Sequence, residues 1–129
     1  MNNKADYGAL YNYLAVNYGN LAPVGWHVST DDDWIQLAAF IGDSAGLRLK
    51  EADTLHWLPP NKGATNSYGF TALPGGVRAG GNSYVGIRKY GVWWSPPSDL
   101  TAKTHAISGI SLTTASPPPA CSVRCVRDY

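Results

Sequence analysis

The stretch TDDDWIQLAAFIG, residues 30–42, defines the helical part of the fold. Thr30 and Asp33 have the spacing of a capping box, in which each side chain accepts a hydrogen bond from the backbone of the other residue. With Gly42 at the C-terminal cap, this pattern predicts a helix over Asp31–Ile41. Apolar residues recur at helical spacing in the expected helix: Trp34, Leu37, Ala38 and Ile41. We predict that Trp34, Leu37 and Ile41 are buried.

Three adjacent aspartates, Asp31, Asp32 and Asp33, open the expected helix. Carboxylates grouped in this way suggest a calcium site, but negative charge in a first turn also stabilises the helix dipole. The second explanation accounts for the pattern without a ligand. We therefore predict no metal and no other cofactor.

The elements expected before and after this helix in the sequence are less regular. Residues 6–18 fit a short strand followed by a short helix, which Gly19 ends. Residues 44–62 are predicted to be irregular. Strands are predicted over 68–78 and 87–95, joined by a glycine-rich turn that suits a hairpin tip.

Residues 96–121 are small, polar and rich in proline, and they lie between two stretches that resemble strands. Both flanks, 90–95 and 122–128, are rich in aromatic and β-branched residues. A permissive segment held between rigid strands is suited to display a binding surface. A long surface loop with an edge strand explains the same pattern without any function.

The composition limits the classes of function. A length of 129 residues predicts one domain, residues 1–129. The net charge of +1 gives no indication of a nucleic-acid or anionic-membrane partner. No apolar run is long enough to span a bilayer, so we expect no membrane insertion, and no signal peptide is visible.

The two cysteines, Cys121 and Cys125, are four residues apart. In a continuous strand their Cα atoms would lie about 13 Å apart, which is too far for a disulfide. We interpret Cys125 as a small buried residue, His27 as a hydrogen-bonded structural residue, and Arg124 and Arg127 as arginines with buried stems and paired heads.

Five motifs occur along the chain in the following order: YGALYN at 7–12, LAPVGWHVST at 21–30, GFTALPGGVR at 69–78, YGVWWS at 90–95 and SVRCVRD at 122–128. Together these motifs resemble the Fibrobacter succinogenes major paralogous domain family over nearly the whole chain. The family is similar to the formylglycine-generating-enzyme branch of the C-type-lectin fold. This resemblance implies an α+β fold, with a small twisted antiparallel sheet, two helices and extensive coil.

A narrower resemblance concerns residues 96–121. Members of this fold family serve as variable proteins of diversity-generating retroelements, in which a C-terminal segment is rewritten at adenine-containing codons. These are often Asn codons of the AAC/AAT type, and randomising the first two bases of such codons cannot yield Lys, Glu, Gln, Met or Trp. Lys103 is the only residue of these types in the segment. The family often has Gly-Phe before the SVRC motif, where this chain has Ala120 and Cys121.

We therefore predict a ligand-binding display module of the receptor-binding or adhesin type, and no enzyme activity. Its partner is expected to be a protein or glycan on another cell surface. The resemblance implies an extracellular location, on a bacterial surface or a phage tail tip, within a larger assembly. The predicted ligand-binding residues are Trp94, Pro96, Pro97, Ser98, Asp99, Leu100, Thr101, Lys103, His105, Ser111, Thr113, Thr114, Ser116 and Ala120.

Two alternatives remain open. A calcium-independent lectin could use exposed aromatic residues to stack on sugars, and Trp57, Tyr68 and Tyr84 are the candidates. An enzyme like those of the formylglycine-generating branch would use a cysteine pair, and the spacing of Cys121 and Cys125 does not suit that chemistry. No Ser-His-Asp or paired-carboxylate site can be argued from the sequence spacing of His27, His56 and His105.

Overall fold

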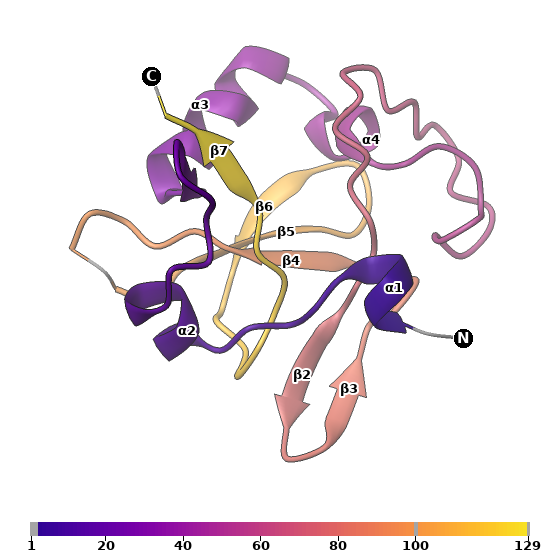
Figure 1. Cartoon of the computed structure of the whole chain (residues 1–129). Helices are drawn as coiled ribbons and strands as arrows, with labels where there is room; N and C mark the ends of the chain where they lie inside the picture. The colour runs from indigo at the N-terminus through magenta and orange to yellow at the C-terminus, as the bar shows by residue number, and fades with distance from the viewer. Residues whose placement is uncertain (1–2, 100, 129) are drawn as a thin grey trace.

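The computed structural model describes residues 3–99 and 101–128 and has a mixed α+β architecture (Figure 1). Among the described residues, no helix is both long enough and apolar enough to cross a membrane. The helices are α1 (Asn3–Tyr7), α2 (Tyr13–Tyr18), α3 (Asp31–Ile41) and α4 (Ala45–Leu49). The strands are β1 (Trp26–Val28), β2 (Val77–Gly80), β3 (Ser83–Val85), β4 (Gly91–Trp94), β5 (Thr104–Ile107), β6 (Leu112–Ala115) and β7 (Cys125–Arg127).

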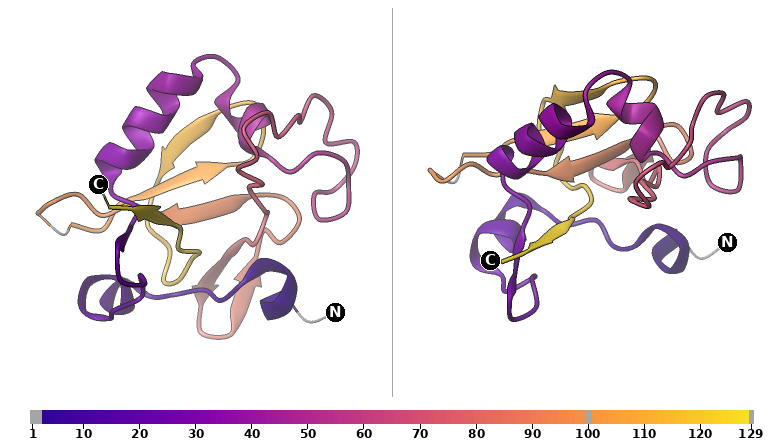
Figure 2. Two further views of the ribbon diagram at one scale, coloured as in Figure 1. Left: turned by 45° about the horizontal axis from the view of Figure 1, so that its top comes forward. Right: turned by 90° about the horizontal axis from the view of Figure 1, so that it is seen from above.

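The centre of the fold is a three-stranded antiparallel sheet in the order β4-β5-β6. Helices α3 and α4 lie on one side of this sheet, whereas α1, α2 and the β2–β3 hairpin lie towards the other (Figures 1 and 2). Strands β1 and β7 form a separate antiparallel pair that joins two segments far apart in the sequence.

Strand β4 is buried on both faces because two hydrophobic clusters cover it. Trp93 belongs to the cluster under α3 and α4, together with Trp34 and Ile107. Val92 and Trp94 belong to the cluster on the other face. Side chains alternate between the faces of a strand, so the adjacent tryptophans anchor the sheet in two opposite directions.

The structure confirms the helix predicted over Asp31–Ile41, including its caps. The Thr30 side chain accepts from the Asp33 N–H, and the Asp33 side chain accepts from the Thr30 N–H, which completes the capping box. Gly42 is the C-cap residue. Trp34 and Ile41 are buried as predicted, while Leu37 is partly buried against the same cluster.

The structure contains two helices where the sequence did not predict them. The N-terminal region begins with helix α1 rather than a strand, and the expected strand reduces to a single bridge between Tyr11 and Cys121. Helix α4 was not predicted in the 44–62 region. It begins without a side-chain cap at Ser44, and Gly46 fits tightly against the carbonyls of Gly109 and Ile110. Helix α4 could not be predicted from the local sequence, because packing against distant residues determines its position.

The predicted strands over 68–78 and 87–95 are too long. The first contains Gly69 and Thr71 at positive φ, and the second contains Arg88 at positive φ, which is incompatible with extended pairing. In the structure, the first predicted strand is reduced to β2 and the second to β4. The predicted hairpin tip at residues 80–83 is confirmed, because Gly80 pairs with Ser83. Its second strand is β3, which lies within the predicted turn, and not the stretch 87–95.

The C-terminal strand is also shorter than predicted, since β7 begins at Cys125. Both cysteines are free, in agreement with the absence of a predicted disulfide. Cys121 is the fully buried one, and Cys125 is only half-buried, which corrects our interpretation of Cys125. Burial raises the pKa of the Cys121 thiol, so this sulfur is a packing atom and not a thiolate.

Candidate functional site

Most of the predicted contact residues in 96–121 are exposed, and we call these exposed residues together the display surface. Strand β6 is the outer strand of the sheet and exposes Thr113 and Thr114. The pairing of Thr104 with Ala115 brings Lys103 next to Ser116. The β4–β5 loop projects from the body of the molecule beside them (Figures 1 and 2). The exposed members are Ser98, Asp99, Thr101, Lys103, Ser111, Thr113, Thr114 and Ser116, with Pro97 half-buried.

Four predicted contact residues are buried, and the structure therefore contradicts their role as ligand contacts: Trp94, Pro96, His105 and Ala120. The Trp94 Nε1 donates to the Tyr11 carbonyl at 2.7 Å. Ala120 lies against β2, where its carbonyl accepts from Arg78 N–H. His105 lies on β5, the central strand, which places it inside the domain. The predicted contact Leu100 lies outside the described residues.

The display surface is tied to helix α3 at its base. Lys103 Nζ lies 3.1 Å from Asp31 Oδ2, and the Lys103 carbonyl accepts from the Ser95 N–H. At the loop tip, the Asp99 side chain accepts from the Thr101 N–H, and this bond is the main cause of the lowered pKa of Asp99. The loop therefore leaves the sheet in a defined direction.

Beneath this surface, Ser95, His105 and Asp31 lie in the order hydroxyl, imidazole and carboxylate. Ser95 Oγ is 2.8 Å from His105 Nδ1, and His105 Nε2 is 3.8 Å from Asp31 Oδ1. A nucleophilic triad requires a hydroxyl that a substrate can reach. Ser95 is 0% exposed, so the group serves to hold β4, β5 and α3 together. Burial lowers the pKa of His105, and the opposing attraction of Asp31 does not offset that effect.

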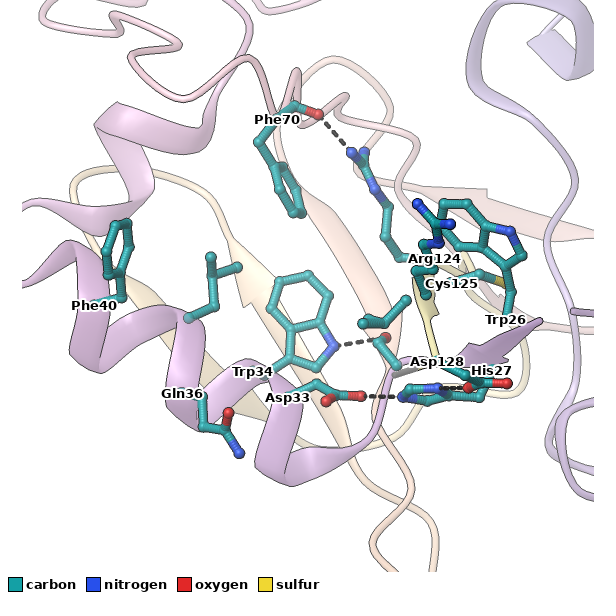
Figure 3. A pocket seen from close by; sticks show the side chains of 14 residues that line it. Trp26, His27, Asp33, Trp34, Gln36, Phe40, Phe70, Arg124, Cys125 and Asp128 are labelled. Carbon is teal, nitrogen blue, oxygen red and sulfur yellow. Dashed lines mark hydrogen bonds and ion pairs between the residues drawn. The ribbon is translucent and has the colours of Figure 1, made fainter.

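Sequence reasoning missed a second feature, a groove of about 910 Å³ between α3 and the β1–β7 pair. We call it the α3 groove. Trp34 and Leu37 contribute from α3, and Phe70 and Val126 contribute from segments far away in the sequence. Figure 3 shows Phe40 and Trp26 at opposite sides of the space, with Arg124 near Phe70. Only the three-dimensional fold brings these residues together.

One end of the α3 groove is held by His27. Its Nε2 lies 2.7 Å from Asp33 Oδ2 and its Nδ1 lies 2.6 Å from Asp128 Oδ1 (Figure 3). The structural role predicted for His27 is therefore confirmed. The hydrogen bonds with Asp128 and then Asp33 raise the pKa of His27. Burial opposes ionisation of Asp33, but its hydrogen bonds with Thr30 and His27 outweigh this and lower its pKa.

This cluster predicts a pH-dependent contribution of His27 to stability. A raised folded-state pKa means that the contribution is complete below the ordinary value of 6.5 and is lost as pH rises through the folded pKa. The Asp33 carboxylate is ionised, and so attracts His27, only above a pH of roughly 4. We therefore expect His27→Gln to lower the free energy of unfolding more at pH 5.5 than at pH 9, measured by urea denaturation. An equal effect of His27→Gln at both pH values would contradict this cluster as an ionic clamp.

Arg124 forms another contact across the groove. Its Nη2 donates to the Phe70 carbonyl at 2.6 Å, and its guanidinium lies 3.9 Å from the centroid of the Phe70 ring. Burial lowers the pKa of Arg124. The buried stem predicted for Arg124 is therefore confirmed, but its head bonds to a backbone carbonyl and not to a carboxylate. Arg127 is exposed, which corrects the buried stem predicted for it.

The aromatic residues considered for sugar stacking do not share one surface. Trp57 is 2% exposed, and its Nε1 donates to the Ala72 carbonyl, so it is unavailable for stacking. Tyr68 is exposed and lies against Phe40, whereas Tyr84 is on β3. Within residues 3–99 and 101–128, no group of three or more His, Cys, Asp or Glu side chains could hold a metal ion.

Comparison with known proteins gave one family match. A family model described as the Fibrobacter succinogenes major domain matches residues 1–127. No curated protein matches the chain. No solved structure matches it either.

Proposed function

The chain belongs to the Fibrobacter succinogenes major domain family, and we propose that it is a ligand-binding display module. The observation that supports this proposal most strongly is the division of residues 96–121 into a buried base and an exposed surface. Strand β5 is nearly all buried, whereas the adjoining loop and the outer strand β6 expose small polar side chains. A rigid scaffold that carries an adaptable surface suits recognition.

More specifically, we propose that the chain is a C-type-lectin-like domain that serves as a variable protein of a diversity-generating retroelement. It is supported by the residue types of 96–121, where Lys103 is the only one that rewritten Asn codons cannot produce. The proposed partner is a protein or glycan on another cell surface. The proposed location is a bacterial surface or a phage tail tip, and no catalytic step is proposed.

A calcium-independent lectin is the second candidate, because two exposed aromatic rings, Phe40 and Tyr68, lie in contact at 5.7 Å between centroids. Aromatic rings on a surface are suited to stack on the apolar faces of sugars. This site lies on α3 and the 68–70 region and is distinct from the display surface, so variants can separate the two candidates.

Sequencing the gene from many cells of one population tests the proposal. Diversification requires that the scaffold survives each change, so we expect substitutions at exposed positions such as Ser98, Thr113 and Ser116. Trp94 and Ala120 should stay constant, because a cavity at Trp94 costs about 3–5 kcal/mol and a larger side chain at Ala120 overpacks the core at a cost of about 1–3 kcal/mol. Substitutions spread evenly along the chain would contradict the proposal.

An exchange experiment tests binding itself. The exposed residues of one population variant are placed on the scaffold of another, with the buried residues unchanged. Binding to whole cells of candidate hosts should follow the exchanged residues, while the melting temperature stays the same. Host preference that instead followed the scaffold would place the binding site elsewhere. In that case Phe40→Ala and Tyr68→Ala test the second candidate site, and each should weaken binding to the host cells.

A further inference from the structure

The α3 groove has the dimensions and lining of a small-molecule site. Its volume of about 910 Å³ falls in the range of ligand pockets, roughly 300–1,000 Å³. Aromatic rings that are at least partly open to solvent line it, namely Trp26 from β1 and Phe70 from the 68–70 region, whereas Trp34 of α3 also lines the groove but is only 2% exposed. Phe40 is 74% exposed at the rim, which is unusual for a phenylalanine on a helix that packs against the core.

The charges in the groove are not balanced. The acidic groups lining it, Asp33 and Asp128, both bind His27, whose raised pKa favours the cation. Arg124 and Arg127 line the same groove, and no carboxylate of the described residues pairs with either. With His27 protonated, these five groups therefore sum to a net positive charge.

Arg124 is the decisive cation. A buried charge is normally paired, since the loss of its hydration is costly. Arg124 is largely covered, yet among the described residues the one hydrogen bond of its guanidinium goes to the uncharged Phe70 carbonyl. A guanidinium carries five N–H donors in a planar fork that matches a carboxylate. The remaining donors of Arg124 are available to a partner from outside the chain.

We propose that the α3 groove binds a small aromatic carboxylate. The ring lies against the aromatic walls, where stacked or edge-to-face contacts are favourable. The carboxylate is held by Arg124, with Arg127 adding attraction from the strand edge. The site is separate from the display surface and does not depend on the function proposed for that surface.

Three probes with the same ring, similar size and different charge test this site: 2-naphthoate, 2-naphthamide and 2-naphthylmethylammonium. Each is titrated into the full chain at pH 6 by calorimetry, and the site is mapped by H–N correlation NMR. We expect 2-naphthoate to bind at least about tenfold more tightly than the amide, since charge-assisted hydrogen bonds are about twice as strong as neutral ones. The ammonium probe should bind most weakly.

Variants locate the binding. Phe40→Ala removes an exposed ring, and Arg127→Gln removes an exposed cation, so neither disturbs the core. Each should weaken 2-naphthoate binding several-fold. Their matched controls, Ile35→Ala on the same helix and Arg48→Gln on α4, lie outside the groove lining and should leave binding unchanged. Arg124→Lys keeps the charge but removes the fork, and should reduce the preference for carboxylate over amide.

Equal binding of the three probes would overturn the proposal, because the groove would then be only an apolar surface. No detectable binding of 2-naphthoate to the folded chain would also overturn it. NMR shifts centred on β6 rather than on α3 and β7 would place the ligand at the display surface and contradict the site. None of these results bears on the exchange experiment, so the two proposals can fail independently.

Discussion

Trp34→Ala is expected to lower the free energy of unfolding by about 3–5 kcal/mol, the cost of a large cavity in a packed core. Trp34 is 2% exposed and lies where the α3 cluster meets the sheet. Its ring contacts those of Phe70, Trp93 and His105 at centroid distances of 5.9, 5.6 and 5.6 Å. Its Nε1 donates to Ser29 Oγ at 2.8 Å, so the substitution also removes a buried hydrogen bond.

Urea denaturation measures this loss, with Ile35→Ala as the matched control. Ile35 is the next residue of α3 and is 53% exposed, so its truncation should cost well under half as much. Because a domain of this size is stable by only about 5–15 kcal/mol, Trp34→Ala should bring it near the threshold of folding. Equal costs for the two substitutions would mean that α3 packs on the sheet through a different face.

The success at α3 and the failure at α4 have a common physical explanation. The start, period and end of α3 are encoded within 13 consecutive residues, because capping and helical periodicity are local. Helix α4 has five residues and no side-chain cap, and it is positioned by contact with the carbonyls of Gly109 and Ile110. Contacts between such distant residues cannot be read from one sequence.

The difference between local sequence signals and distant contacts also explains which residues of the display surface were predicted correctly. The polar composition of residues 96–121 indicated a surface, and for Ser98, Thr113 and Ser116 the structure agrees. It did not indicate that β5 is the central strand, because alternating small residues fit an edge strand equally well. Burial of His105 follows from its neighbours on β4, β6 and α3, none of which its own sequence context specifies.

The α3 groove was invisible to sequence reasoning for a related reason. Its residues come from β1, α3, the 68–70 region and the C-terminal strand, and each has an ordinary structural explanation in isolation. Arg124 was correctly expected to have a buried stem, but its lack of a carboxylate partner appears only when the fold is known. One indication was present in the sequence, namely a large aromatic residue, Phe40, off the apolar stripe of the helix.

His105→Ala should produce the second large loss, about 2–4 kcal/mol, although His105 lies in the segment expected to tolerate substitution. The ring is 5% exposed and stacks on Trp34, with an angle of 11° between the two planes. Removing it leaves Ser95 Oγ, which is fully buried, without its partner at 2.8 Å. A buried group that loses its hydrogen bond costs about 1–3 kcal/mol, and the lost packing adds to this.

Thr114→Ala is the matched control, because Thr114 lies directly opposite His105 on β6 and is exposed. Its substitution should change stability by less than about 0.5 kcal/mol. His105→Asn retains a polar group near Ser95 and loses the stacking, whereas His105→Phe retains the stacking and loses the hydrogen bond. If both contributions matter, each of these variants should lie between the wild-type chain and His105→Ala in urea denaturation. A cost for His105→Ala no greater than that for Thr114→Ala would show that β5 tolerates change like the display surface, and the buried base proposed for that surface would be wrong.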